Sequence, residues 1–87
     1  MESKNKYWLT PKELEVLQRL AMGDTYKMVS ENCGITMGTV NYHIVNIYQK
    51  LQVNSKTSAV IKAMREKLVS VSSHIFIWYL NDIQIFV

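Results

Sequence analysis

The sequence predicts an all-α fold: a tetrahelical domain with a helix-turn-helix at its centre, followed by a short apolar tail. A Thr-x-x-Glu capping box begins one helix at Thr10, and Gly23 and Gly34 end two segments with helical periodicity. Thr36 can cap a further helix, about residues 36–51. The apolar residues of this helix recur at helical spacing and form one stripe, which we expect to be buried: Val40, Ile44, Ile47 and Leu51.

The first helix has the strongest local signals in the chain. Residues 1–8 predict a flexible lead-in, after which Thr10 is the expected N-cap, Pro11 occupies N1 and Glu13 completes the capping box. Leu9 and Leu14 have the spacing of a hydrophobic staple. The buried face of this helix is expected to consist of Leu14, Leu17, Leu20 and Ala21.

The second helix is shorter and the third has two different faces. Residues 25–33 place Tyr26, Val29 and Cys33 on one side before Gly34 ends the helix. Opposite its apolar stripe, the third helix presents a face that contains no acid: Gly38, Asn41, Tyr42, Val45, Asn46 and Gln49. Such a helix, preceded by a shorter one, is how helix-turn-helix proteins present a recognition helix to the major groove of DNA.

The C-terminal part divides into a fourth helix and a tail. Ser55 is the expected cap of a helix over about residues 56–68, with Ala59, Val60, Ala63 and Met64 on its apolar side. From His74 onward the chain is β-branched and aromatic, and Asn81-Asp82 between two apolar runs is typical of a hairpin turn. Residues 69–87 are therefore expected to be either β-like or packed on a partner.

Composition bounds the class of protein. The 87 residues are enough for one domain, and a single cysteine, Cys33, excludes an internal disulfide framework. No secretory signal or membrane-spanning run is visible, which predicts a cytoplasmic protein without a membrane partner. The net charge of +3 is modest, but all ten Lys and Arg lie in residues 1–68, which suits a polyanionic partner.

Several motifs, taken together, resemble the LuxR/NarL (GerE-type) helix-turn-helix domain. Residues 9–17 read Leu-Thr-Pro-Lys-Glu-Leu-Glu-Val-Leu, as in the opening of that family. Further matches follow in the right order and at the right spacing: Tyr-Lys-Met-Val-Ser at 26–30, Ile-Thr at 35–36, Thr-Val-Asn-Tyr-His at 39–43, Asn-Ile-Tyr-Gln-Lys-Leu-Gln-Val at 46–53 and Ser-Lys-Thr-Ser-Ala-Val at 55–60. The variants present look most like response-regulator members.

The resemblance implies that residues 9–68 are the DNA-binding domain of a bacterial transcriptional regulator. The third helix, about 36–51, would enter the major groove while the second crosses the DNA backbone. In this family dimerisation runs mainly through the fourth helix, about 56–68, where we expect Ala59 and Ala63 to be exposed and to contribute to a twofold surface. The chain would then be either a fragment, with a receiver or sensor domain missing from it, or a stand-alone effector.

The residues expected to contact DNA divide by role. Asn and Gln can pair with adenine, Val45 can meet a thymine methyl group, and lysines can reach phosphates. The full set is Lys27, Thr36, Thr39, Asn41, Tyr42, Val45, Asn46, Gln49, Lys50 and Lys56. His43 is interpreted as a packing residue or a phosphate contact.

Departures from the family leave two alternatives open. Family members usually carry Lys or Arg where this chain has Asn41, and often where it has Val45. The chain could therefore be a protein-interaction module, an antagonist or partner of another regulator that has lost strong DNA affinity. A second alternative is an assembly role in which the tail adds to the sheet edge of another chain.

Nothing in the sequence predicts an enzyme, a metal site or a cofactor. Cys33 with the scattered His43 and His74 lacks the spacing of zinc ligands. Glu13 and Glu15 lie in the first turn of a helix, where capping and the helix dipole account for them. No glycine-rich phosphate loop, paired carboxylates or Ser/His/Asp arrangement is present.

Overall fold

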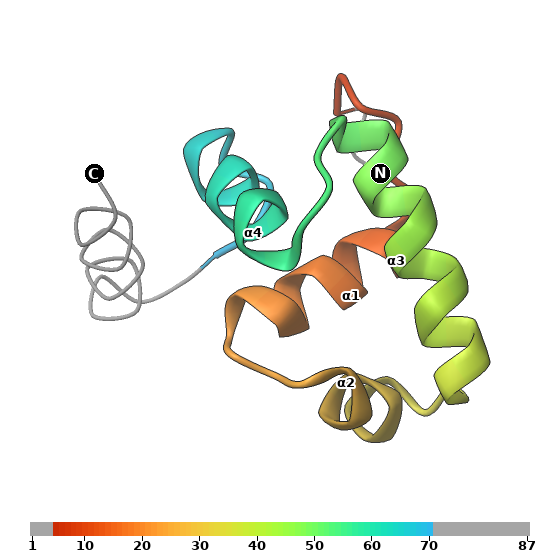
Figure 1. Cartoon of the computed structure of the whole chain (residues 1–87). Helices are drawn as coiled ribbons and strands as arrows, with labels where there is room; N and C mark the ends of the chain where they lie inside the picture. Colours follow the sequence, from red (N-terminus) through yellow and green to blue (C-terminus); the bar gives the residue numbers. More distant parts are fainter. Residues whose placement is uncertain (1–4, 71–87) are drawn as a thin grey trace.

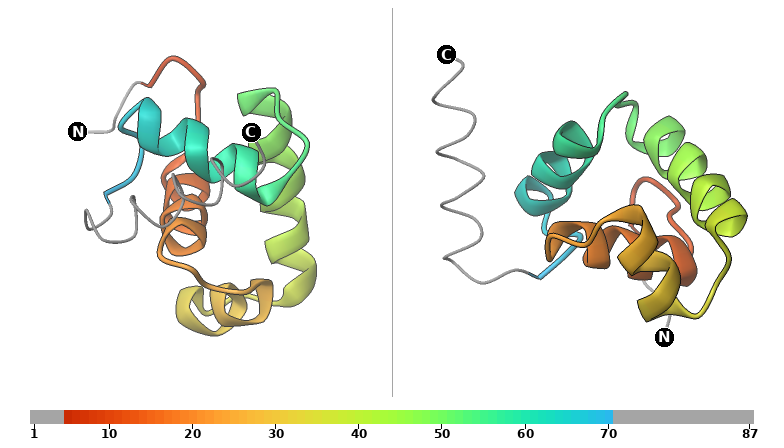
Figure 2. Two further views of the ribbon diagram at one scale, coloured as in Figure 1. Left: turned by 60° about the vertical axis from the view of Figure 1, so that its left-hand side comes forward. Right: turned by 60° about the horizontal axis from the view of Figure 1, so that its bottom comes forward.

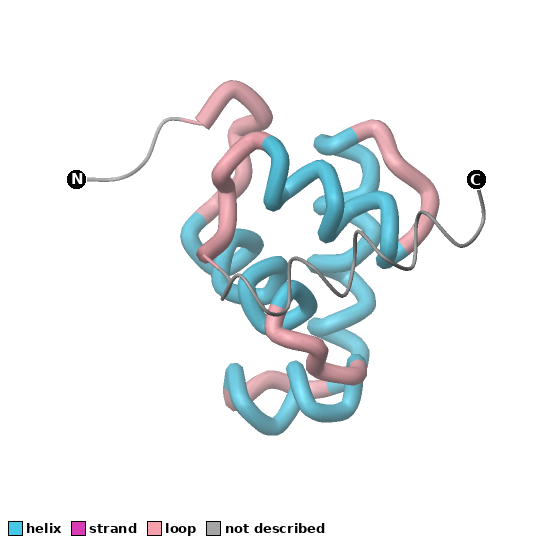
Figure 3. The backbone as a smooth tube through the Cα atoms, turned by 90° about the vertical axis from the view of Figure 1, so that its left-hand side faces the viewer, coloured by secondary structure: helices cyan, strands magenta, loops and turns pink. Residues whose placement is uncertain are grey.

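A computed structural model describes residues 5–70, which form four helices joined by short turns (Figure 1). The helices are α1 (Pro11–Ala21), α2 (Tyr26–Cys33), α3 (Met37–Leu51) and α4 (Lys56–Arg65). Within residues 5–70 the chain contains only helices and loops (Figure 3). The predicted all-α, tetrahelical fold is confirmed.

The helices are arranged around α1 and α3. Each of these two packs on all the others, and α2 and α4 lie on opposite sides of α1 (Figures 1 and 2). The turn from α2 to α3 is short, as a helix-turn-helix requires. One flank of α3 therefore remains uncovered by the other three helices.

Every helix begins with a hydroxyl side chain that accepts the backbone N–H three residues further on. The caps are Thr10, Thr25, Thr36 and Ser55. In α1 the capping box is complete, because the Glu13 carboxylate accepts the Thr10 N–H at 2.9 Å. The caps predicted at Thr10, Thr36 and Ser55 are confirmed, whereas Thr25, expected inside the second helix, lies just before it.

Every helix is also followed, within two residues, by a residue with left-handed backbone. These residues are Gly23 (φ 97°), Gly34 (φ 67°), Gln52 (φ 58°) and Lys67 (φ 59°). The next N–H then bonds a carbonyl five residues back, as in Schellman motifs. In α4 this bond joins Leu68 N to Ala63 O at 2.8 Å, so the helix ends at Arg65 rather than at the expected Leu68.

The buried stripe of α3 is the one predicted, since Val40, Ile44, Ile47 and Leu51 are all buried. The prediction for α1 was partly wrong: Glu13 and Val16 join Leu17, Leu20 and Ala21 inside, while Leu14 is half-buried at the edge of the core. In α2 only Val29 is fully buried; Tyr26 and Cys33 pack against the core from the side.

The expectation that Ala59 and Ala63 are exposed was wrong. Both are fully buried with Val60 and Met64, on the side of α4 that packs against α1 and α3. Their small side chains allow this side to approach its neighbours closely. Any partner of α4 must therefore bind its other side.

The segments before α1 and after α4 are attached to the helices. Residues 5–8, expected to belong to a flexible lead-in, form a turn in which Asn5 Oδ1 accepts the N–H groups of Tyr7 and Leu9. After α4, Ser70 N donates to Gln18 Oε1 at 2.8 Å and Val69 packs on the core. The tail expected over 69–87 otherwise lies outside the described residues. No helix within residues 5–70 is long and apolar enough to cross a membrane.

Candidate nucleic-acid interface

The uncovered flank of α3 presents a continuous set of exposed side chains. At 3.6 residues per turn they fall within one arc centred near Val45. We call this set the exposed arc of α3: Met37, Gly38, Asn41, Tyr42, Val45 and Gln49. Tyr42 is 65% exposed and Val45 is 52% exposed, although both carry large apolar surfaces. No member of the arc carries a charge.

Residues at the margins of the arc have other contacts. The Thr36 hydroxyl accepts the Thr39 N–H at 3.1 Å and lies 3.0 Å from the Thr39 hydroxyl, so both threonines also serve the cap of α3. Asn46 is half-buried. The His43 ring meets the Tyr42 ring edge-on at 5.6 Å, and its buried Nδ1 has no hydrogen-bond partner among residues 5–70.

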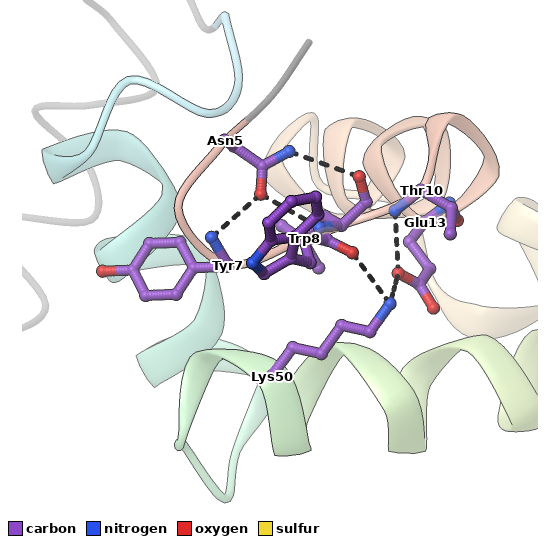
Figure 4. A network of polar contacts seen from close by, with 7 residues as sticks. Asn5, Tyr7, Trp8, Thr10, Glu13 and Lys50 are labelled. Carbon is purple, nitrogen blue, oxygen red and sulfur yellow. Dashed lines mark hydrogen bonds and ion pairs between the residues drawn. The ribbon is translucent and has the colours of Figure 1, made fainter. Parts of the chain in front are cut away.

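The three lysines of the predicted site differ in their surroundings. Lys27 is exposed near the start of α2 and makes no ion pair within residues 5–70. Lys56 is half-buried, and its Nζ donates to Asp24 O at 3.0 Å. Lys50 Nζ donates to Glu13 Oε1 at 2.7 Å and to Trp8 O at 3.0 Å (Figure 4). The structure thus places Lys50 and Lys56 in internal contacts, outside the exposed arc.

The Lys50 contact joins the end of α3 to the start of α1. The Glu13 side chain is 5% exposed, and one of its oxygens accepts both the Thr10 N–H and the Lys50 ammonium. Trp8 presents its carbonyl to the same ammonium from a left-handed conformation, φ 59° (Figure 4). A buried carboxylate requires such a partner, because an unpaired charge in the interior is costly.

Two further contacts hold α2 in place, one to α3 and one to α1. The hydroxyls of Tyr26 and Tyr48 lie 2.9 Å apart, and burial together with this hydrogen bond raises the pKa of Tyr48. Asp24, buried before α2, accepts from Arg19 Nε at 2.8 Å and from Asn32 Nδ2 at 2.8 Å. The Arg19 hydrogen bond lowers the pKa of Asp24, with Asn32 contributing, against the opposing effect of burial. The position of α2 is thus held by partly buried polar contacts as well as by apolar packing.

Sequence reasoning missed two exposed apolar side chains beside the predicted site. Met37, 43% exposed, occupies the first turn of α3 and belongs to the exposed arc, while Met28, 42% exposed, lies on α2. The signal for Met37 was its position, four residues before Asn41 and eight before Val45, on the same side of the helix.

Metal binding has no support in the described part of the chain, where no group of three or more His, Cys, Asp or Glu is placed to hold an ion. Burial and the adjacent Glu15 raise the pKa of the Cys33 thiol, which opposes its activation as a nucleophile. What the described surface offers is a helix flank of exposed polar and apolar side chains.

Comparison with known proteins agrees with this arrangement. Residues 8–63 match the family model described as bacterial regulatory proteins, luxR family. The chain belongs to the luxR family. The match includes all of α1, α2 and α3 and most of α4, and the family is one of regulatory proteins rather than of enzymes.

Relatives of the chain are transcriptional regulators of greater length. It is 45% identical over 62 residues to the transcriptional regulatory protein LiaR of Bacillus subtilis (strain 168), covering 71% of this chain and 29% of LiaR. It is 42% identical over 62 residues to the transcriptional activator protein AnoR of Acinetobacter nosocomialis, covering 71% of this chain and 26% of AnoR.

A solved structure has the same fold. The response regulator ChrA of a heme-sensing two-component system matches with a TM-score of 0.69 and 34% identity, over 75% of this chain and 32% of ChrA. The chain therefore spans about a quarter to a third of the length of these proteins.

Proposed function

We propose that residues 9–68 bind duplex DNA sequence-specifically, as the effector domain of a bacterial transcriptional regulator acting in the cytoplasm. In this proposal α3 enters the major groove with its exposed arc toward the bases, and α2 crosses the backbone with Lys27 near a phosphate. The observation that carries the proposal is the exposed arc itself, presented on a helix whose opposite side is fully packed.

The rigidity of the helix pair supports this function. A recognition helix must hold its side chains within a small distance of the base edges, and α3 is fixed by its buried stripe, the Tyr26–Tyr48 contact and the Lys50–Glu13 ion pair. Membership of a family of regulators, with relatives that are transcriptional regulators, supports the same conclusion.

We further propose that two copies bind paired half-sites and associate through α4. Because Ala59 and Ala63 are buried, the contact would use the opposite side of α4, where Ser58 and Arg65 are exposed and Ile61 is half-buried beside Val53. These residues line a shallow hollow that a symmetry-related helix could fill. The similarity to a response regulator supports a receiver or sensor domain as a further partner.

The first test is selection of binding sites from a random pool of DNA duplexes at low salt, with the 87-residue chain. Enrichment of a short motif, especially an inverted repeat, is the expected result. Retention without enrichment would reduce the proposal to phosphate contact alone. Absence of retention would refute it and favour a protein-interaction module.

A variant then tests the surface. Tyr42→Ala should weaken binding to the selected duplex by about 5-fold or more, because an exposed base-contacting ring is lost while the core is untouched. Trp8→Ala is the matched control, since Trp8 is also an exposed aromatic, 75% exposed, but lies outside α3. Fluorescence anisotropy measures both affinities. Equal affinities for the two variants would remove Tyr42 from the interface.

A further inference from the structure

We infer that the exposed arc of α3 recognises half-sites composed mainly of A·T base pairs, through thymine methyl groups and adenine edges. The inference rests on the proposed DNA binding and specifies which base pairs the domain reads. It follows from what the arc contains, from what it lacks, and from the positions of the nearest cations.

The arc lacks the groups that read G·C pairs. Guanine is recognised in the major groove mainly by Arg or Lys, which donate to its O6 and N7 atoms, and cytosine N4 donates to Asp or Glu. From Met37 to Gln49 the helix contains no Arg, Lys, Asp or Glu. Neither member of a G·C pair therefore meets its usual charged partner along this length of α3.

The cations near α3 are directed elsewhere. Lys50, in the last turn, is held by Glu13 Oε1 at 2.7 Å and by Trp8 O at 3.0 Å. It lies away from Val45 around the helix. Five residues turn an α-helix by about 1.4 turns, which leaves Lys50 nearer to the opposite side than to Val45. Arg19 is paired with Asp24, and Lys27 lies on α2 rather than on α3. Lys50 is thus the only Lys or Arg on α3, and it is directed away from the arc.

The groups that the arc does contain match A·T pairs. Asn41 and Gln49 carry amides, which can pair with the N6 and N7 atoms of adenine. Val45 lies between them, four residues from each, and provides the apolar surface that a thymine methyl group contacts. Tyr42 and Met37 extend this apolar surface to either side.

The spacing along the helix separates these contacts. Four residues rise about 6 Å along α3, nearly two base-pair steps of about 3.4 Å. Asn41, Val45 and Gln49 therefore face different base pairs rather than competing for one. An amide, a branched apolar side chain and a second amide in succession specify a short run of adenines and thymines.

The test uses the duplex selected from the random pool and changes one functional group at a time. Replacing thymine by 2′-deoxyuridine removes only the C5 methyl group. We expect about a fourfold loss of affinity for each contacted methyl group, corresponding to about 0.8 kcal/mol for one buried carbon. Replacing an A·T pair that an amide reads by G·C should cost about 5- to 150-fold.

Variants identify the side chain responsible. In Val45→Ala the loss caused by deoxyuridine should shrink toward zero at one position, while Met22→Ala, also an exposed apolar residue but outside α3, should retain the full effect. Val45→Arg places a guanidinium in the arc and should shift the selected sequence toward guanine at that position.

Each result decides a separate point. Enrichment of G·C half-sites, with guanine-dependent affinity, would overturn the inference and leave DNA binding intact. An A·T-rich site bound equally well with deoxyuridine would overturn the methyl contact. Absence of any retained duplex would overturn the proposed function, and this inference with it.

Discussion

Single residues at the end of α3 show how the recognition helix is anchored. Glu13 is almost fully buried, and Lys50 supplies the positive charge that its carboxylate faces. Lys50 is itself about one-third exposed, so its ammonium is reachable by water while its partner is not. Removing the lysine should therefore matter mainly through the carboxylate that remains behind.

Lys50→Met should destabilise the protein by about 1–3 kcal/mol, less than for a fully buried pair because Lys50 is partly solvated. The double variant Glu13→Gln/Lys50→Met should recover part of this loss, since the amide oxygen can still accept the Thr10 N–H. Urea unfolding measures both free energies. Lys12→Met removes an exposed ion pair with Glu15 and serves as the control, with little expected change in the free energy of unfolding.

The same variants separate two roles for Lys50. If it contacted a phosphate in the complex, Lys50→Met would reduce the salt dependence of DNA binding by about 0.9 in log–log slope. If it acts only through Glu13, the slope should be that of the wild type at temperatures where the variant is folded. Lys27→Ala, at an exposed lysine, is the comparison expected to reduce the slope.

Asp24 makes the free energy of unfolding sensitive to acid. Its pKa is lowered, chiefly by the hydrogen bond from Arg19, so the unfolded chain binds protons more readily than the folded one near pH 4. The stabilisation is complete above the unfolded pKa of about 3.8 and is lost as pH falls through the lower folded value. Unfolding free energies should therefore fall below about pH 4.

Asp24→Asn tests this directly. The variant should be less stable than wild type at pH 7 but should lose less stability between pH 5 and pH 2.5, measured by urea unfolding at constant ionic strength. Glu31→Gln, at an exposed carboxylate without an ion pair in residues 5–70, should follow the wild-type profile. Parallel profiles for wild type and Asp24→Asn would assign the acid sensitivity to other groups.

At the level of helices, starts were easier to predict than ends. Three helix starts could be predicted from their N-caps, because Ser and Thr are preferred at that position: Thr10, Thr36 and Ser55. Two helix ends could be predicted from Gly23 and Gly34, because glycine is the preferred residue just after a helix. Gln52 and Lys67 end the other two in left-handed backbone that most residue types avoid, so nothing in their identity predicted it. The fourth helix was therefore predicted too long.

Gln52→Gly should stabilise the protein by about 0.5–1 kcal/mol. Glycine adopts the left-handed conformation without the steric cost that a β-carbon brings. This gain exceeds the free-energy cost of the greater conformational entropy that glycine has in the unfolded chain. Lys67→Gly is expected to act in the same direction. Gln49→Gly is the matched control, because the same change inside α3 should destabilise by about 1 kcal/mol. Thermal unfolding distinguishes the two signs.

For the molecule as a whole, the spacing of apolar residues in the sequence predicted the fold well. It predicted less well which lysines of the site are free and which are held in internal contacts. The phase of Val40, Ile44, Ile47 and Leu51 fixed which flank of α3 is exposed. The partners of Lys50 and Lys56 lie 37 and 32 residues away in sequence, so only the tertiary structure reveals that these lysines are engaged. The burial of Ala59 and Ala63 likewise depends on how closely α4 approaches α1 and α3.

Association of two copies is the property that depends on the whole domain. If α4 joins them as proposed, the distance between their recognition helices is fixed, and the two half-sites must face the same side of the duplex. Inserting about 5 base pairs between the half-sites turns one of them by half a helical turn. Affinity for the paired site should then fall to that of a single half-site, and an insertion of about 10 base pairs, which restores the orientation but moves the half-sites about one helical turn further apart, should have the same effect.

Ile61→Arg provides the matched protein variant. It places a charge on the side of α4 opposite the buried alanines and should abolish the sensitivity to spacing, leaving single half-site affinity intact. Thr57→Arg adds the same charge at an exposed position of α4 and controls for the added attraction to DNA. If the Ile61→Arg protein still prefers the original spacing to one with about 5 inserted base pairs, the two copies associate through a surface other than α4, because a buried like-charge pair across a twofold axis would separate them.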